Sequence, residues 1–206
     1  MDNSMGKSVT YFLAPQSPWT YLGHDRLVAI AKAHHAKIEI KPFDLGKVFS
    51  VSGGLPLAKR APQRQAYRLL ELARWSQQLG LPLNPQPTFF PIPPDAAAKL
   101  IIAARTSLGA EAALELAGAV MRALWAADKN IADGDTLAQV ASNCGFDGRM
   151  LVKSAQTAGV QEQYERNTDD AMAANVFGAP WYVVDGVGFW GQDRLDFVER
   201  ALAKAV

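Results

Sequence analysis

The 206-residue sequence predicts a mixed α/β fold in which a helical block separates an N-terminal strand–helix–strand unit from a C-terminal strand–strand–helix unit. Three observations carry this prediction. Short β-branched and aromatic runs of strand character lie near the two ends of the chain. Helical patterns, which are alanine-rich from about residue 95 onward, dominate residues 61–176, where no stretch has clear strand character. Finally, the Asp185-Gly186 pair, which is typical of a two-residue hairpin turn, separates two short apolar runs.

The N-terminal unit begins with a short apolar stretch, Val9 to Leu13, which predicts a buried strand. A helix follows the Ser17-Pro18 pair and runs to about His35, because side chains with helical spacing form one face: Leu27, Ile30, Ala31 and His34. The next stretch, "AKIEIKPF", alternates isoleucine with charged residues and predicts a second strand. Strand, helix and strand in this order form a right-handed βαβ unit.

The middle of the chain has helical periodicity. A helix is predicted over residues 62–79, and it ends at Gly80 and Pro82. The proline-rich stretch "LPLNPQPTFFPIPPD" then excludes regular helix and central strand. Five further helical segments follow, near residues 95–108, 110–128, 135–143, 147–157 and 160–176.

At the C-terminal end, "WYVVDGVGFW" predicts a hairpin, and an amphipathic helix is predicted over Asp193 to Ala205. The complete order, βαβ, helices and ββα, is that of a thioredoxin-like fold. We therefore expect a thioredoxin-like domain built from residues 1–60 and 177–206, interrupted by an all-helical insertion over residues 61–176.

Composition limits the classes of partner. The formal charge of +1 provides no basic surface for nucleic acid, so we expect a small-molecule partner. No apolar run has the length of a membrane span, and the N-terminal stretch lacks the apolar core of a signal peptide. Cys144 is the only cysteine, and we interpret it as an unreactive apolar side chain. These features favour the cytoplasm, and no residue set has metal-ligand spacing.

Ser17 stands where the first strand meets the first helix. A serine followed by proline is a common helix N-cap, so the residue has a purely structural explanation. In a thioredoxin-like fold, however, this turn holds the reactive centre, where the helix N-terminus stabilises an anion. "SPWT" contains no thiol and cannot exchange disulfides. A serine hydroxyl can instead donate a hydrogen bond to the thiolate of another molecule, for which glutathione is the natural candidate.

Two features near the C-terminus fit a peptide-like ligand of this kind. Ala179-Pro180 is either an ordinary turn or the cis-proline position of thioredoxin-like folds, where the backbone before the proline pairs with an extended ligand. Asp193 has two explanations. It either stabilises the last helix as an acidic residue in the first turn, or it pairs with a ligand ammonium group while nearby N–H groups bind a carboxylate. The γ-glutamyl end of glutathione carries both groups.

Four stretches together, "SPWTYLG", "ELARWSQQLGLPLN", "FGAPWYVV" and "WGQDRLDFVE", resemble the 2-hydroxychromene-2-carboxylate isomerase family. This family is related to the kappa-class glutathione transferases and has a DsbA-like thioredoxin fold. The resemblance implies that Ser17 is catalytic and that the protein forms a homodimer. It also implies a set of glutathione-binding residues: Ser17, Ala179, Pro180, Trp190, Gly191, Gln192 and Asp193.

The resemblance further implies a reaction in aromatic-compound catabolism. The glutathione thiolate adds to a conjugated carbon of 2-hydroxychromene-2-carboxylate, the ring opens, and a double bond becomes a rotatable single bond. Rotation and loss of glutathione give trans-o-hydroxybenzylidenepyruvate. Glutathione is regenerated and acts as a cofactor in covalent catalysis.

The substrate carboxylate requires a cation, and the family takes substrate contacts from the segment that contains Lys47, Lys59 and Arg60. We interpret Lys47 as a surface charge and expect Lys59, Arg60 and Phe89 to contact the substrate. Phe89 and Phe90 either line an aromatic pocket or anchor the proline-rich connector. "SGGLPLAKRAP" lacks the Asn-Arg pair of the naphthalene-pathway enzymes, so the exact substrate stays open. Two alternatives also stay open: a kappa-type glutathione transferase or peroxidase, and a non-catalytic thioredoxin-like binding protein.

Overall fold

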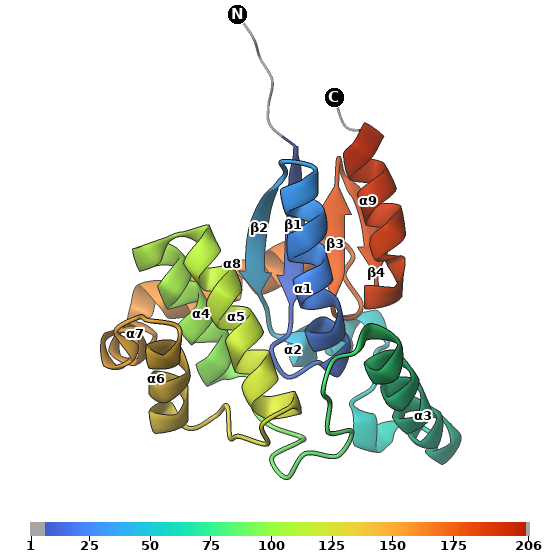
Figure 1. The fold of residues 1–206 in the computed structure, drawn as a ribbon, viewed down its shortest axis with the longest axis horizontal. Helices are drawn as coiled ribbons and strands as arrows, with labels where there is room; N and C mark the ends of the chain where they lie inside the picture. Colours follow the sequence, from blue (N-terminus) through green and yellow to red (C-terminus); the bar gives the residue numbers. More distant parts are fainter. Residues whose placement is uncertain (1–6, 205–206) are drawn as a thin grey trace, which may run out of the picture.

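A computed structural model describes residues 7–204. It contains a four-stranded sheet in the order β2-β1-β3-β4 (Figure 1). The N-terminal strands, β1 (Ser8–Leu13) and β2 (Lys37–Pro42), are parallel. The C-terminal strands, β3 (Trp181–Val184) and β4 (Val187–Trp190), form an antiparallel hairpin, and β3 pairs antiparallel with β1. The predicted βαβ unit and hairpin are confirmed.

Strand β1 divides the core into two parts because its side chains alternate between the two faces of the sheet. Val9, Tyr11 and Leu13 belong to the larger cluster, which continues through the helical insertion. Phe12 points to the other face, where it belongs to a smaller cluster that also contains Trp181. Both faces of β1 are therefore covered, as its short β-branched and aromatic sequence predicts.

Three helices and a 3₁₀ turn flank the sheet in the terminal segments. Helix α1 (Pro18–Ala33) follows β1, as predicted, and α2 (Leu45–Ser52) follows β2. Helix α2 was not predicted, although Asp44 caps its start and Gly53 ends it in a left-handed conformation. The last helix begins with a 3₁₀ turn, η2 (Gln192–Arg194), and continues as α9 (Leu195–Lys204). The predicted end at Ala205 lies outside the described residues.

The insertion is helical, as predicted. It contains α3 (Pro62–Leu79), α4 (Asp95–Leu108), α5 (Ala110–Trp125), α6 (Gly134–Asn143), α7 (Gly148–Ser154) and α8 (Ala158–Ala173), preceded by the 3₁₀ turn η1 (Leu57–Lys59). Three helices, α5, α7 and α8, end about three residues earlier than predicted. After α5 and α8, a polar residue with positive φ, Asp128 and Asn175 respectively, turns the chain out of the helix.

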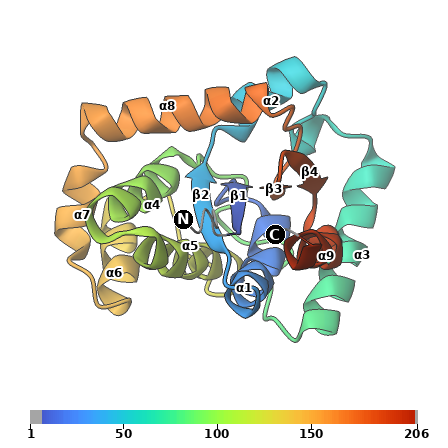
Figure 2. The same cartoon turned by 90° about the horizontal axis from the view of Figure 1, so that it is seen from above.

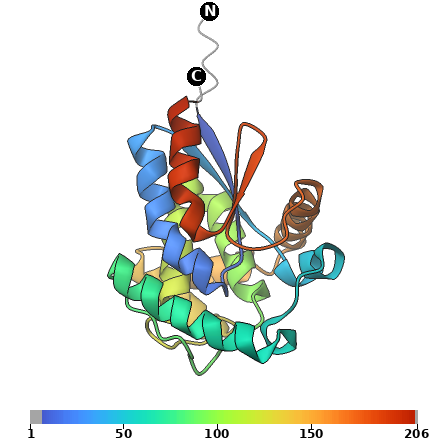
Figure 3. The ribbon, with the colours of Figure 1, turned by 90° about the vertical axis from the view of Figure 1, so that its right-hand side faces the viewer.

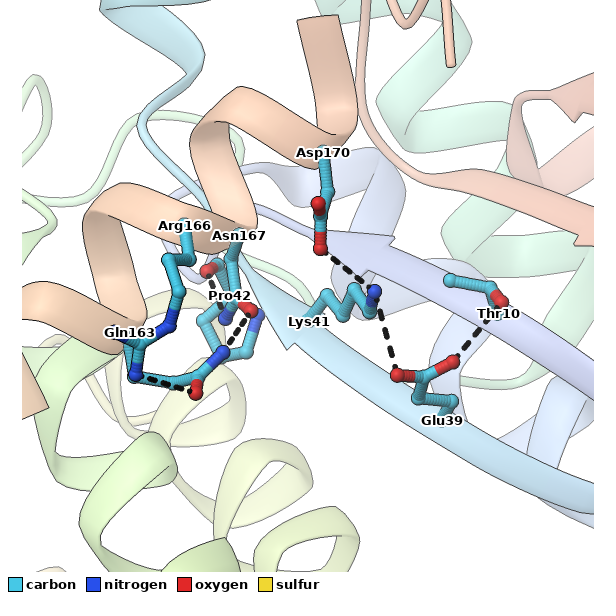
Figure 4. A network of polar contacts seen from close by, with 8 residues as sticks. All are labelled: Thr10, Glu39, Lys41, Pro42, Gln163, Arg166, Asn167 and Asp170. Atoms are coloured by element: carbon cyan, nitrogen blue, oxygen red, sulfur yellow. Dashed lines mark hydrogen bonds and ion pairs between the residues drawn. The ribbon is translucent and has the colours of Figure 1, made fainter. Parts of the chain in front are cut away.

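Helix α8 lies on the opposite side of the sheet from α1 (Figure 2). It is fixed to the edge strand β2 by polar contacts (Figure 4). Asp170 pairs with Lys41 at 2.8 Å, and the Asn167 amide donates to the Pro42 carbonyl at 3.0 Å. The Thr168 hydroxyl accepts a hydrogen bond from the Asp44 backbone N–H at 3.0 Å. These contacts hold the segment from which α2 begins.

The large core cluster joins strand side chains such as Tyr11 to insertion side chains such as Leu100 and Leu124, so the core is continuous between the two parts. The proposed boundaries of the insertion therefore stay a prediction. Helix α3 lies across the end of the molecule where β1 ends and α1 begins (Figure 3). No helix in residues 7–204 is long and apolar enough to cross a membrane.

Candidate active site

Ser17 is the N-cap of α1, which confirms the structural half of its prediction. Its backbone is extended, and its Oγ accepts a hydrogen bond from the Thr20 N–H at 3.3 Å. The same hydroxyl donates to the Ala179 carbonyl oxygen at 3.4 Å, and the residue is only 7% exposed. The hydroxyl is therefore held at the positive end of a helix, where an anion is stabilised.

The peptide bond between Ala179 and Pro180 is cis. The Ser17 hydroxyl and the Ala179 carbonyl are 162 positions apart in sequence, and they meet because β1 pairs with β3. The Pro180 carbonyl accepts a hydrogen bond from the Gly191 N–H at 3.0 Å. This bond ties the cis-proline turn to the loop that opens the last helix.

Ser17 and Ala179 lie on the wall of a pocket of about 690 Å³. Helix α2 and its following loop, the first turns of α3, and the proline-rich connector supply the other walls. Five aromatic residues line the pocket: Trp19, Phe49, Phe90, Phe177 and Trp190. Among the described residues on this wall, the ionisable side chains are all arginines: Arg60, Arg64 and Arg68. The pocket therefore suits an aromatic ligand that carries negative charge.

The predicted γ-glutamyl-binding residues lie beside this pocket, and only Trp190 lines it. Gln192 is 2% exposed, and its side-chain oxygen accepts a hydrogen bond from the Arg26 guanidinium at 3.1 Å. The Gln192 side-chain oxygen thus already has a hydrogen-bond partner within the protein. Asp193 forms a half-exposed ion pair with Arg194 at 2.7 Å. Exposed pairs of this kind are weak and exchange readily.

The structure places only one of the three predicted substrate-binding residues on the pocket wall. Arg60 lines the pocket, whereas Lys59 is exposed and lies outside its wall. Phe89 is 39% exposed and also lies outside, and the next residue, Phe90, takes the place in the wall. The connector turns here, with the Phe90 N–H donating to the Pro87 carbonyl at 3.1 Å, so adjacent side chains point in different directions. Lys47 is exposed.

The sequence analysis missed Arg68, which is 9% exposed on α3. Its guanidinium carbon lies 5.2 Å from the ring centroid of Phe90 and 5.8 Å from that of Trp125. Burial, reinforced by the charge of Arg60, lowers the pKa of Arg68 to about 10. One signal was available in the sequence: Arg68 precedes Leu72 by four positions and so lies on the apolar face of the helix.

Two other chemically reactive side chains lie away from the pocket. His24 is buried, with one ring nitrogen 3.3 Å from the Tyr11 hydroxyl and the other 2.9 Å from the Leu114 carbonyl oxygen. Burial lowers the pKa of His24, which keeps the ring neutral inside the core. Burial raises the pKa of the Cys144 thiol, which disfavours the reactive thiolate. Within residues 7–204, no three metal-binding side chains come together.

Comparisons with known proteins agree with this fold. The model of the DsbA-like thioredoxin domain family matches residues 8–203. A 2-hydroxychromene-2-carboxylate isomerase from Sphingobium xenophagum is 27% identical, with 96% of this chain and 99% of the relative aligned. Glutathione S-transferase kappa 2 from Caenorhabditis elegans is 29% identical over 96% of this chain and 92% of its own length.

Among solved structures, a 2-hydroxychromene-2-carboxylate isomerase superposes with a TM-score of 0.81 at 26% identity, covering 96% of this chain and 95% of that one. The similarity therefore extends over the strands, the helical insertion and the turn that carries Ser17. The chain belongs to the DsbA-like thioredoxin domain family.

Proposed function

We propose that this protein is a glutathione-dependent isomerase that acts on 2-hydroxychromene-2-carboxylate or a related intermediate of aromatic-compound degradation. One observation carries the proposal. At the reactive turn of a thioredoxin-like fold, a serine hydroxyl lies 3.4 Å from the carbonyl oxygen that precedes a cis-proline, on the wall of an aromatic pocket. The similarity to isomerases over nearly the whole chain supports the same reaction.

Ser17 and Ala179 fit the cysteinyl part of glutathione. The Ser17 hydroxyl has one proton, which it donates to the Ala179 carbonyl. The backbone N–H of an extended peptide ligand can replace this donor at the carbonyl, as an added strand does. The hydroxyl proton is then free to form a hydrogen bond to a thiolate, and the N-terminus of α1 favours the same negative charge.

The loop after β4 fits the γ-glutamyl part. N–H groups in the first turn of a helix lack intrahelical acceptors and can bind a carboxylate. A ligand ammonium group can compete with Arg194 for Asp193, because both side chains of that ion pair are half-exposed. We assign Trp190, Gly191 and Gln192 to the same part of the site, Gln192 through its backbone because its side chain is bonded to Arg26.

When bound, glutathione would supply the nucleophilic thiolate that adds to the substrate and leaves after bond rotation. Ser17 would hold that thiolate ionised, and the aromatic wall would orient the substrate ring and limit its contact with water. We place the reaction in the cytoplasm, where thiols are kept reduced. The homodimer stays a prediction based on the family resemblance.

The decisive assay follows 2-hydroxychromene-2-carboxylate with far less glutathione than substrate. An isomerase converts many substrate molecules for each glutathione, and free glutathione remains at the end. The similarity to the Caenorhabditis elegans glutathione S-transferase supports the alternative of a kappa-type transferase, which would consume one glutathione for each conjugate formed. A protein that binds glutathione without converting this substrate or a panel of electrophiles would be a binding protein, and the proposal would be wrong.

A further inference from the structure

The pocket contains a buried cation that the protein itself leaves without a matching charge. Arg68 is 9% exposed, and its Nη2 atom is buried without a hydrogen-bond partner. Buried guanidinium groups are normally paired, because removing a charge from water costs several kcal/mol. The described residues on the pocket wall include no aspartate or glutamate. Within the described residues, Nη2 of Arg68 thus has no hydrogen-bond partner, and an anion from outside the chain can supply one.

The neighbours of Arg68 define the shape of that anion. The ring centroids of Phe90 and Trp125 lie within 5.8 Å of the Arg68 guanidinium carbon, so two aromatic rings hold the side chain in place. A guanidinium held in one orientation presents two parallel N–H groups, which match the two oxygens of a carboxylate. The partly buried apolar wall nearby, including Phe90 and Ile92, suits a planar ring attached to that carboxylate.

The other two arginines in the pocket are less suited to this role. The Arg60 Nε already donates to the Leu55 carbonyl at 2.8 Å. Arg64 is exposed, so water competes for its hydrogen bonds. Both add positive potential along the pocket wall, which favours an anionic ligand in general. Arg68 is the buried one, and hydrogen bonds from a charged donor gain most strength where water is excluded.

We propose that Arg68 binds the carboxylate of an aromatic acid substrate and so determines the specificity of this pocket for acids over neutral analogues. The inference builds on the proposed function, because it concerns the second ligand of the same site. Arg68 acts on substrate binding and orientation, whereas Ser17 acts on the thiol.

The test measures binding without glutathione, by calorimetry, of two probes: trans-2-hydroxycinnamate and its methyl ester. Wild-type protein should prefer the acid to the ester by about tenfold or more, as expected for a charge-assisted pair. Arg68→Met keeps an unbranched side chain against the aromatic rings and removes the charge. It should weaken acid binding about tenfold or more and leave ester binding within about twofold. The matched control, Arg64→Met, removes a charge one helical turn away and should change acid binding less than about threefold.

A separate glutathione titration distinguishes failures of the two proposals. If Arg68→Met weakens acid binding but the wild-type protein binds no glutathione, the inference stands and the proposed function fails. If Arg68→Met weakens glutathione binding and not acid binding, Arg68 pairs with a glutathione carboxylate and the inference is wrong. Equal affinity of wild type for acid and ester would also overturn it.

Arg68→Lys covers the case in which Arg68→Met does not fold. Lysine keeps the charge and loses the two-pronged geometry, so the preference for acid over ester should fall several-fold without disappearing. An unchanged preference in folded Arg68→Lys, judged by its thermal unfolding, would show that the guanidinium does not contact the carboxylate.

Discussion

Replacing Ser17 by alanine separates the two roles of its hydroxyl. As a helix cap, the hydroxyl accepts one hydrogen bond from the Thr20 N–H, and its loss should cost about 1 kcal/mol of unfolding free energy. For a chain of this size, that corresponds to a decrease in melting temperature of about 2–4 °C. A protein with about 5 kcal/mol of stability would remain more than ~99% folded after this loss. The capping role therefore predicts almost no change in turnover.

The catalytic role predicts a much larger effect. Removing one oriented donor to a reacting anion typically lowers turnover by about 100- to 1,000-fold. The Ser17 hydroxyl is oriented in this way, because the residue is only 7% exposed and its oxygen accepts a hydrogen bond from the Thr20 N–H. Its proton, which it donates to the Ala179 carbonyl in the absence of a ligand, becomes available to the thiolate when a ligand N–H takes its place. Turnover of 2-hydroxychromene-2-carboxylate at saturating glutathione should therefore fall at least ~100-fold in Ser17→Ala.

Asp133→Ala provides the matched control. Asp133 caps α6 through a 2.7 Å hydrogen bond from the Thr136 N–H, and it does not line the pocket. Its loss should lower the unfolding free energy modestly, as the loss of a helix cap does, while turnover stays within about twofold of wild type. If Ser17→Ala and Asp133→Ala lose stability and turnover to the same small extent, Ser17 is only a cap and the catalytic role is refuted.

Two further perturbations test the surroundings of the site. Because burial lowers the pKa of His24, the unfolded chain binds a proton there more readily than the folded protein. The contribution of His24 to the unfolding free energy should therefore be fully present above about pH 6.5. It should decrease as the pH falls further, by at most about 1.4 kcal/mol per pH unit. Denaturant titrations at several pH values should find a shallower decrease in His24→Gln, and an identical slope would contradict the assignment of a neutral, buried ring. In Gly178→Ala, the new Cβ would overlap the Trp190 indole nitrogen, so the indole must move. Because Trp190 is half-exposed, unfolding free energy should change by about 0.5 kcal/mol or less while glutathione affinity, measured by calorimetry, decreases several-fold; unchanged affinity would remove Trp190 from the site.

The sequence predicted the elements whose local signals agree with one another. The βαβ unit follows from apolar periodicity, and the hairpin follows from the Asp185-Gly186 pair at its turn. Helix α3 was predicted with its observed bounds because Pro62 starts it and Gly80 ends it. Helix α2 was missed because it is only eight residues long and one side chain, Val48, is fully buried, so its apolar periodicity is weak.

The candidate site was predictable only in part, because it is assembled from distant segments. The meeting of Ser17 with Ala179 could be inferred from the thioredoxin-like order of strands. The spacing to Leu72 places Arg68 on the apolar face of α3, but it does not show what encloses the side chain, which is a ring from the connector, Phe90, and a ring from α5, Trp125. Choosing between Phe89 and Phe90 required the direction of one turn in a proline-rich segment, where no periodicity exists to assign side chains to a face.

The most direct test of the central claim, that Ser17 stabilises a thiolate which the protein borrows, is the pKa of the glutathione thiol in the complex. The ultraviolet absorbance of the thiolate, followed against pH with the protein in excess, measures this pKa. An ordinary thiol has a pKa of about 8.5. The account predicts that the bound thiol ionises at least about one pH unit lower in wild-type protein, and that Ser17→Ala removes most of this shift. A bound thiol that ionises at its ordinary pKa in wild-type protein would contradict the account, as would an equally lowered pKa in Ser17→Ala.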